Sequence, residues 1–310
     1  MGIYTRKDTT SLAQHTRVRP PQSASDIFLA GGSTGILLIH GLGGTPVELK
    51  LVARGLHAAG YTVHCCTLAG HCGTESDLAN TCWDDWFASV EAAFLRLTTQ
   101  CTHVFAGGLS MGGILALHLA THHQAQLQGL LLYAPTLWYD GWSMPWYRSL
   151  LRLIINTPLG RNYRFIEREP YGIKNLRIRQ RLSDDMIAGA STEAGLLGTP
   201  ALALRELWRL VDVVRPNLYR IKTPTLLVQA RDDDVSSLSN SVYLMRHLGG
   251  IVDLTVLDDS YHIVTIDQQR TIVIDRTIRF VETIATNKQS PLANPSRDAT
   301  VERPPKTPPR

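Results

Sequence analysis

Ser110 stands at the centre of the pentapeptide Gly-Leu-Ser-Met-Gly, residues 108–112, a setting in which a serine can act as a nucleophile. The apolar segment 102–106 is typical of a strand, and the segment 114–123 is compatible with a helix. A sharp strand-to-helix turn strains the serine backbone, and glycines flank it because a Cβ would collide with the neighbouring strand or helix. The pattern predicts a nucleophile elbow, although a Gly-rich connection with a capping serine also fits it.

A serine hydroxyl is a weak nucleophile at neutral pH, so it needs a base and a carboxylate that orients the base. The apolar segment 225–230 runs into the three aspartates 232–234, and the segment 252–257 is followed by His262. The order Ser, acid, His, with each residue at the end of a strand, matches one known arrangement of catalytic triads. We take Ser110, Asp233 and His262 as the candidate triad, and the neighbouring aspartates stay open as alternative acids.

The tetrahedral oxyanion of acyl transfer requires two hydrogen-bond donors. The backbone N–H of Met111, directly after the nucleophile, is the first candidate. The second is the N–H of Leu42, because the Gly-rich segment 40–46 follows an early strand and lets amides turn toward a pocket. A Gly-rich loop can also hold phosphate, but this one lacks the Lys-Ser/Thr ending of a P-loop and the spacing of a dinucleotide fingerprint.

Short β-type segments alternate with amphipathic segments along most of the chain. We expect strands at 35–39, 61–65, 127–133, 225–230 and 252–257, and helices at 46–59, 83–98, 238–248 and 267–284. This alternation predicts an α/β fold with a mostly parallel sheet flanked by helices. Chemistry in such sheets lies at the carboxyl ends of the strands, where the candidate residues fall.

The segment from about 136 to 204 interrupts this alternation and contains no clean strand. We interpret it as an inserted cap over the carboxyl edge of the sheet that shapes a substrate pocket. It is rich in aromatic residues, which also fits a small core that fastens the cap to the sheet. Its arginines could meet a substrate carboxylate or an acidic carrier protein, or form a solvated basic face. The aromatic residues are Trp138, Tyr139, Trp142, Trp146 and Tyr147, and the arginines are Arg161, Arg164, Arg168, Arg177, Arg179 and Arg181.

Six motifs together resemble the bacterial carboxylesterase and monoacylglycerol lipase branch of the α/β-hydrolase superfamily. The resemblance covers about residues 35–284 and implies a cofactor-free serine hydrolase of carboxylic esters, with Ser110 as nucleophile, His262 as base and the acid in the aspartate cluster. It places the acid at Asp233, four residues before a family proline that is Ser237 here. The motifs are His-Gly-Leu-Gly-Gly-Thr-Pro (40–46), Leu-Ala-Gly-His (68–71), Trp-Asp-Asp-Trp (83–86), the elbow, Asp-Val (234–235) and Ser-Tyr-His (260–262).

The resemblance leaves other reactions open, because relatives on this fold transfer acyl groups or cleave thioesters and amides with the same triad. We therefore keep an acyltransferase or thioesterase acting on carrier-bound acyl groups as an alternative, together with a non-catalytic ligand-binding protein. No metal and no cofactor is expected. The expected partner is a small-molecule ester, with a carrier protein as the further option.

Composition and charge describe the rest of the chain. Residues 1–26 and 288–310 are interpreted as flexible tails, the second rich in proline, around a hydrolase domain at 27–287. Residues 1–25 and 286–310 each carry a formal charge of +3, so the segment between them is near −2 and offers no basic stripe for nucleic acid. With no apolar N-terminal segment and none of membrane-spanning length, we expect a cytoplasmic protein without a membrane span.

Overall fold

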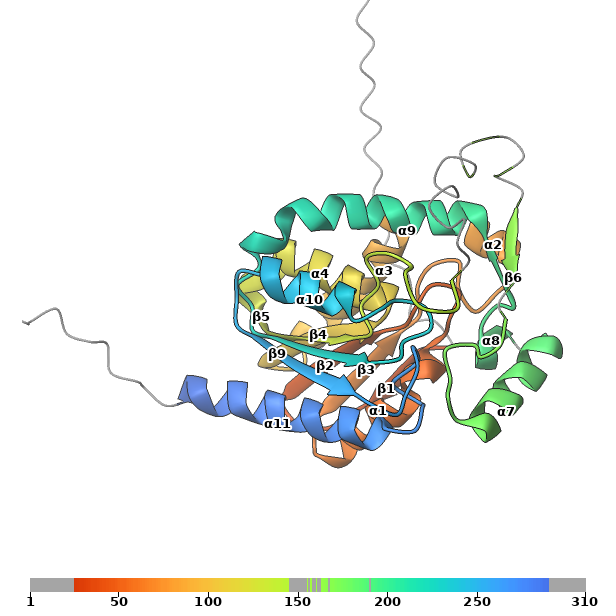
Figure 1. Ribbon diagram of the computed structural model, residues 1–310. Helices are drawn as coiled ribbons and strands as arrows, with labels where there is room; N and C mark the ends of the chain where they lie inside the picture. Colours follow the sequence, from red (N-terminus) through yellow and green to blue (C-terminus); the bar gives the residue numbers. More distant parts are fainter. Residues whose placement is uncertain are drawn as a thin grey trace, which may run out of the picture.

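A computed structural model describes residues 25–144, 155, 157, 160, 163–166, 168–189 and 191–289. Its centre is a seven-stranded sheet in the order β1-β3-β2-β4-β5-β8-β9 (Figure 1). All neighbouring strands pair in parallel except β1, which is antiparallel to β3. The mostly parallel sheet predicted from the sequence is confirmed. The strands are β1 (Ile27–Leu29), β2 (Thr34–Ile39), β3 (Thr62–Cys66), β4 (His103–Leu109), β5 (Leu127–Tyr133), β8 (Thr225–Ala230) and β9 (Val252–Leu257).

Helices cover both faces of the sheet. Along β2, Ile36 and Leu38 belong to one buried apolar cluster, whereas Leu37 and Ile39 belong to the other. Side chains alternate between the faces of a strand, so a strand buried on both faces is apolar throughout. One face carries α1 (Lys50–Ala58) and α11 (Arg270–Gln289), and the other carries α2 (Glu75–Ala79), α3 (Trp83–Thr98), α4 (Met111–His123), α9 (Ala201–Val214) and α10 (Ser239–His247) (Figure 1).

The segment between β5 and β8 contains the predicted cap. It includes α7 (Leu176–Ile187), α8 (Ser191–Ala194) and a small antiparallel pair, β6 (Arg164–Ile166) with β7 (Gly198–Pro200). The expectation of no strand here is wrong, because three-residue strands with a mixed burial pattern leave no readable periodicity. The predicted cap end at 204 lies inside α9, which packs on α4. The predicted cap residues Trp146, Tyr147 and Arg161 lie outside the described residues.

The two predicted tails lie mostly outside the described residues. Of residues 1–26, only Ser25 and Asp26 are described, and the Asp26 carboxylate accepts a hydrogen bond from the Thr67 N–H at 2.8 Å. At the other end α11 continues to Gln289, and residues 290–310 are not described. In the described part of the chain, no helix has the length and apolar character needed to cross a membrane.

Candidate active site

Ser110 occupies the turn between β4 and α4 with φ 55° and ψ −117°, so it has the strained backbone expected of an elbow. A non-glycine residue in such a conformation costs roughly 1–3 kcal/mol, which its surroundings must offset. A Cβ on Gly108 would lie 2.2 Å from the carbonyl oxygen of Ile39, and one on Gly112 would lie 2.0 Å from the same atom. Glycine is therefore required on both sides of the serine, because β2 passes directly against the turn.

His262 and Asp233 form a direct pair beyond the carboxyl ends of β9 and β8. His262 Nδ1 lies 3.0 Å and 2.9 Å from the two carboxylate oxygens of Asp233. Asp233 Oδ1 also accepts hydrogen bonds from the N–H groups of Val235 and Ser236, and Oδ2 accepts one from Gln229 Nε2 at 2.6 Å. These donors orient the carboxylate. The carboxylate in turn accepts a hydrogen bond from the Nδ1–H group, which leaves Nε2 free to act as a base.

The charge of Asp233 controls the protonation of the histidine. Burial by itself is the largest influence and lowers the pKa of His262, but the surrounding carboxylates, Asp233 foremost, together outweigh burial and hold that pKa above its ordinary value of 6.5. Asp234 and Glu48 add smaller contributions in the same direction. The imidazolium that would form when His262 takes a proton is therefore stabilised by fixed negative charge.

The other two aspartates of the cluster lie differently. Asp232 is exposed, and its carbonyl oxygen accepts a hydrogen bond from Trp142 Nε1. Asp234 is buried, and its two carboxylate oxygens accept the backbone N–H groups of His262 and Gly172, each at 3.2 Å. Burial raises the pKa of Asp234. The geometry thus places only Asp233 of the three on the imidazole, while Asp234 joins the histidine loop to the cap segment at Gly172.

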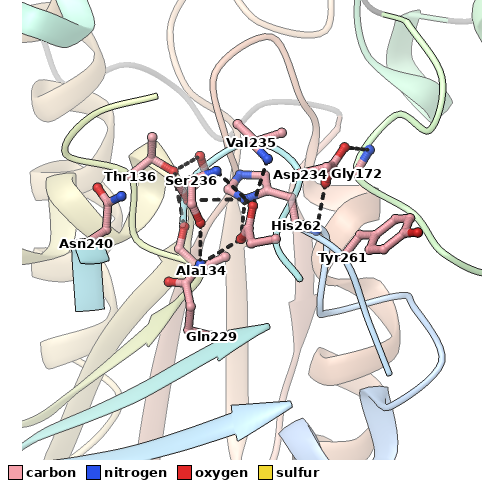
Figure 2. A network of polar contacts seen from close by, with 12 residues as sticks. Ala134, Thr136, Gly172, Gln229, Asp234, Val235, Ser236, Asn240, Tyr261 and His262 are labelled. Atoms are coloured by element: carbon pink, nitrogen blue, oxygen red, sulfur yellow. Dashed lines mark hydrogen bonds and ion pairs between the residues drawn. The ribbon is translucent and has the colours of Figure 1, made fainter. Parts of the chain in front are cut away.

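The Ser110 hydroxyl has a partner that the sequence did not indicate. Its Oγ shares a hydrogen bond of 3.0 Å with Thr136 Oγ1, which lies 3.1 Å from Ser236 Oγ. Figure 2 shows Thr136 and Ser236 beside His262, and Ser236 Oγ lies 3.4 Å from His262 Nδ1. Two hydroxyls therefore connect Ser110 to the imidazole. Thr136 lies 26 residues from Ser110 in the chain, and no local pattern marks it. Catalytic hydrogen bonds are often long or misaligned before substrate binds.

The two predicted oxyanion donors belong to different segments, Leu42 to the loop after β2 and Met111 to the start of α4. Met111 is the first residue of α4, where a backbone N–H has no partner within the helix. Leu42 lines the cavity that also reaches Ser110 and His262, and its N–H has no hydrogen-bond acceptor among the described residues. The Gly41 carbonyl beside it accepts a hydrogen bond from His40 Nδ1 at 2.9 Å. Burial lowers the pKa of His40 to about 4, so this ring is neutral at pH 7.

Ser237, at the position where the resembling family has a proline, holds the acid loop to the cap. Its N–H and its hydroxyl each donate to the Asp140 carboxylate at 2.7 Å. Proline has no backbone N–H, so it would remove the first of these bonds. Asp140 also accepts hydrogen bonds from Trp138 Nε1 and from Asn240 Nδ2. Serine thus replaces the family proline at a position where both the backbone N–H and the side chain bind the Asp140 carboxylate.

Ser110 and His262 open into one large cavity of about 1350 Å³ under the cap. Apolar side chains line much of it, and both cations and carboxylates line the rest. Among the described residues, no three His, Cys, Asp or Glu side chains come together as a metal-binding group. The apolar lining includes Leu42, Leu137, Phe165, Ile178, Leu182, Trp208 and Ile263, and the cations include Lys50, Arg54, Arg168, Arg177 and Arg181.

Comparison with known proteins decides the family. The family model described as serine aminopeptidase, S33, matches residues 33–269, well over half of the chain. The chain belongs to the S33 family of α/β-hydrolases. This S33 hydrolase is 28% identical over 263 residues to the thermostable monoacylglycerol lipase of Bacillus sp. (strain H-257), covering 84% of this chain and 96% of that protein.

Two further relatives agree with this placement. The S33 hydrolase is 25% identical over 254 residues to the carboxylesterase of Bacillus subtilis (strain 168), covering 81% of this chain and 94% of that one. A solved structure from work on LipS and LipT, two metagenome-derived lipolytic enzymes, shares 27% identity with a TM-score of 0.72, covering 83% and 97% of the two chains. The family resemblance inferred from the motifs is confirmed, and the chain is an esterase/lipase-like hydrolase.

Proposed function

We propose that this protein hydrolyses carboxylic esters with Ser110 as nucleophile, His262 as general base and Asp233 as the orienting acid. Ser110 Oγ attacks the ester carbonyl carbon while His262 Nε2 takes the hydroxyl proton. The carbonyl π electrons move to oxygen, and the N–H groups of Leu42 and Met111 stabilise the resulting oxyanion. When the tetrahedral intermediate collapses, the ester C–O bond breaks and the imidazolium protonates the leaving alkoxide, which releases the alcohol and leaves an acyl-enzyme.

Water completes the cycle by the same route. His262 removes a proton from water, the hydroxide attacks the acyl carbon, and collapse of the second intermediate returns the proton to Ser110 Oγ and releases the acid. The Ser110 hydroxyl must first turn from Thr136 toward Nε2, and rotation about its Cα–Cβ bond is the movement that we propose.

The observation that carries this proposal is that one cavity is lined both by a serine at positive φ, Ser110, and by His262, whose imidazole is paired with the buried Asp233. The Nδ1 proton is directed to a carboxylate that accepts three further hydrogen bonds, so the tautomer with a free Nε2 is favoured. The relatives named as a monoacylglycerol lipase and a carboxylesterase support an ester as the substrate. The apolar cavity supports a bulky acyl or alcohol group, since pockets of about 300–1,000 Å³ already hold drug-sized ligands.

The first test is hydrolysis of p-nitrophenyl esters, from acetate to palmitate, by the wild type and by Ser110→Ala. Loss of the nucleophile should lower kcat by about three to six orders of magnitude. Ser76→Ala is the matched control, because Ser76 lies in α2 and is absent from the lining of the cavity. A fluorophosphonate probe should label the wild type once and leave Ser110→Ala unlabelled.

Each result decides the proposal. Serine-dependent turnover supports it, and the chain-length optimum then sizes the acyl pocket. Turnover that survives in Ser110→Ala contradicts the nucleophile assignment. A folded wild type that takes the fluorophosphonate label but cleaves no ester of any length contradicts ester hydrolysis and favours carrier-bound or amide substrates. A folded wild type with no labelling favours a ligand-binding protein.

One observation favours a second candidate, hydrolysis or transfer of acyl groups from an anionic thioester carrier. Lys50 and Arg54 of α1 and Arg177 of α7 line the cavity and have no ion-pair partner among the described residues. Arg181 lies 4.0 Å from Asp185, a long and exposed contact. Cations that line an apolar cavity fit an acyl chain attached to a phosphate-bearing group.

Butyryl-CoA, compared with p-nitrophenyl butyrate, tests this candidate at constant acyl length. Exposed ion pairs contribute about 0.2–1 kcal/mol each, so the double variant Arg54→Gln/Arg177→Gln should lower kcat/KM for the CoA thioester about 2- to 30-fold. The neutral ester should be unaffected, and Arg246→Gln, an exposed arginine outside the cavity lining, is the control. If the double variant changes kcat/KM for the CoA thioester and for the neutral ester equally, these cations do not recognise the carrier, and the candidate is contradicted.

A further inference from the structure

Glu48 is a carboxyl group in the cavity that the mechanism above does not use. It lies in the short 3-10 helix η1 (Pro46–Leu49) that follows the Gly-rich loop, and its side chain turns back over that loop. Its Oε2 accepts a hydrogen bond from the Gly41 N–H at 3.2 Å. A Cβ on Gly44 would lie 2.0 Å from Oε1, so the carboxyl packs directly against the loop, and a side chain at position 44 would displace it.

The loop under Glu48 carries the Leu42 N–H. The Gly41 carbonyl and the Leu42 N–H belong to one planar peptide group, so they point in opposite directions. The carbonyl accepts His40 Nδ1 at 2.9 Å and the Gly44 N–H at 3.3 Å, and these bonds fix the direction of the Leu42 N–H. Glu48 holds the preceding peptide through its N–H. Two successive peptide groups are thus fixed, and the second of them contains the proposed oxyanion donor.

We infer that Glu48 is a positioning residue that holds the peptide group of Gly41, and through it the Leu42 N–H, in the orientation that receives the oxyanion. The inference rests on the proposed function, because the oxyanion arises only in acyl transfer. Effective catalysis requires donors that are already oriented when charge develops. A shift of about 1 Å in such a group can lower a rate by about 100-fold.

The charge of Glu48 gives the inference a signature in pH. Burial raises the pKa of Glu48 to about 7, against the opposing effects of the Gly41 N–H, of His262 and of the Thr45 N–H. The titratable groups that face Glu48 are His262, from the loop after β9, and Cys72, from the segment after β3. Lys50, two residues after Glu48 in the chain, lines the same cavity. Above this pKa a carboxylate lies beside the oxyanion loop and opposes a negative transition state.

Three substitutions separate position from charge. Glu48→Gln keeps a carbonyl oxygen for the Gly41 N–H, so we expect kcat within about threefold of wild type at pH 6. Glu48→Leu removes the acceptor, and Glu48→Asp keeps the charge but shortens the side chain by one methylene. Both should lower kcat about 10- to 100-fold with KM little changed. Glu282→Leu and Glu282→Gln, on the exposed side of α11, are the matched controls.

The pH dependence of the rate and the affinity for an inhibitor are two measurements that a purely structural role of Glu48 would leave unchanged. Glu48→Gln should gain rate relative to wild type above about pH 7, because it carries no charge near the oxyanion. It should also move the acidic limb to lower pH, because the carboxylate no longer raises the pKa of His262. A trifluoromethyl ketone, which forms a tetrahedral adduct, should bind Glu48→Leu more weakly by the factor lost in kcat/KM.

The outcomes are distinct from those of the proposed function. If Ser110→Ala abolishes hydrolysis while folded Glu48→Leu and Glu48→Asp keep the wild-type kcat, the positioning role is refuted and the triad stands. If Glu48→Gln loses as much kcat as Glu48→Leu at pH 6, an acceptor oxygen is not what the loop needs, and the inference is also refuted. Should Glu48→Leu fail to fold, Glu48→Asp and Glu48→Gln still decide between the two results.

Discussion

Asp233→Asn tests the candidate acid with a change of one atom. Asp233 Oδ1 accepts the N–H groups of Val235 and Ser236, and only an oxygen can meet both donors. The carbonyl of the new Asn is therefore held at that position, and its NH2 takes the place of Oδ2. That NH2 would lie 2.9 Å from His262 Nδ1 and 2.6 Å from Gln229 Nε2, so one donor faces two donors.

Neither partner can adapt without loss. A flip of the Gln229 amide would put its oxygen against the Ser236 carbonyl, which now accepts the Gln229 NH2 at 2.9 Å. The imidazole relieves the conflict by moving its proton from Nδ1 to Nε2, and that tautomer cannot take the Ser110 proton. The same change costs about 10⁴ in kcat in a serine protease triad, or about 5 kcal/mol. We expect a loss of about 10³–10⁴ here.

The assay compares kcat/KM for one p-nitrophenyl ester across the three aspartate-to-asparagine variants, with thermal unfolding as a check on folding. Asp232→Asn should resemble wild type, because this side chain is exposed. Asp234→Asn exchanges one acceptor of a backbone N–H for a donor, so it should cost about 1–3 kcal/mol of stability and less than about tenfold in rate. A loss at Asp234→Asn as large as that at Asp233→Asn would refute the assignment.

Four further results should follow. The rate should rise with pH through a midpoint above 6.5, measured as kcat/KM from about pH 5 to 9, because His262 acts as a base only when neutral and its pKa is raised. The ion pair of charged His262 with Asp233 should stabilise the fold fully below the pKa of this histidine in the unfolded chain. This stabilisation should be lost as pH rises through the higher pKa of His262 in the folded protein, and melting temperatures at several pH values measure the loss. Gly112→Ala should lower the melting temperature by roughly 6–12 °C, since its Cβ would meet the Ile39 carbonyl at 2.0 Å at a cost of about 3 kcal/mol. Thr136→Val should change kcat less than about tenfold and leave fluorophosphonate labelling of Ser110 intact, because Thr136 holds the hydroxyl only in the resting state; abolished labelling would show that Thr136 takes part in catalysis.

The sequence predicted the central sheet closely. The segments 127–133, 225–230 and 252–257 form strands with the predicted bounds. The first two are buried on both faces and are largely apolar. The third lies at the edge of the sheet, and its apolar residues alternate with Asp253 and Thr255. The edge strand β1 was not foreseen, since three residues give no usable period. The helix α9 has buried residues at Leu204, Leu207, Leu210, Val211 and Val214, a helical spacing that could have ended the predicted cap at Ala201.

The site was predictable where a motif fixes local geometry and not where the partner is distant in sequence. The elbow and the Asp and His segments each follow a strand, so their common edge could be deduced. Thr136 and Glu48 make contacts that depend on how the loops pack. In the sequence, Glu48 looks like any surface glutamate in the first turn of a helix. Only the family resemblance favoured Asp233 over Asp234 in the sequence, because neighbouring residues on one loop do not reveal the direction of each side chain.

Gly172 gives the cap and the base a shared support. Its N–H donates to Asp234, whose other oxygen holds the His262 N–H, and its carbonyl accepts the Ile263 N–H at 2.8 Å. The cap and the histidine loop are therefore thermodynamically linked, and any free energy that stabilises one stabilises the other. A ligand that stabilises the cap segment at Gly172 will also stabilise the histidine loop, and a change that breaks these hydrogen bonds will weaken ligand binding under the cap.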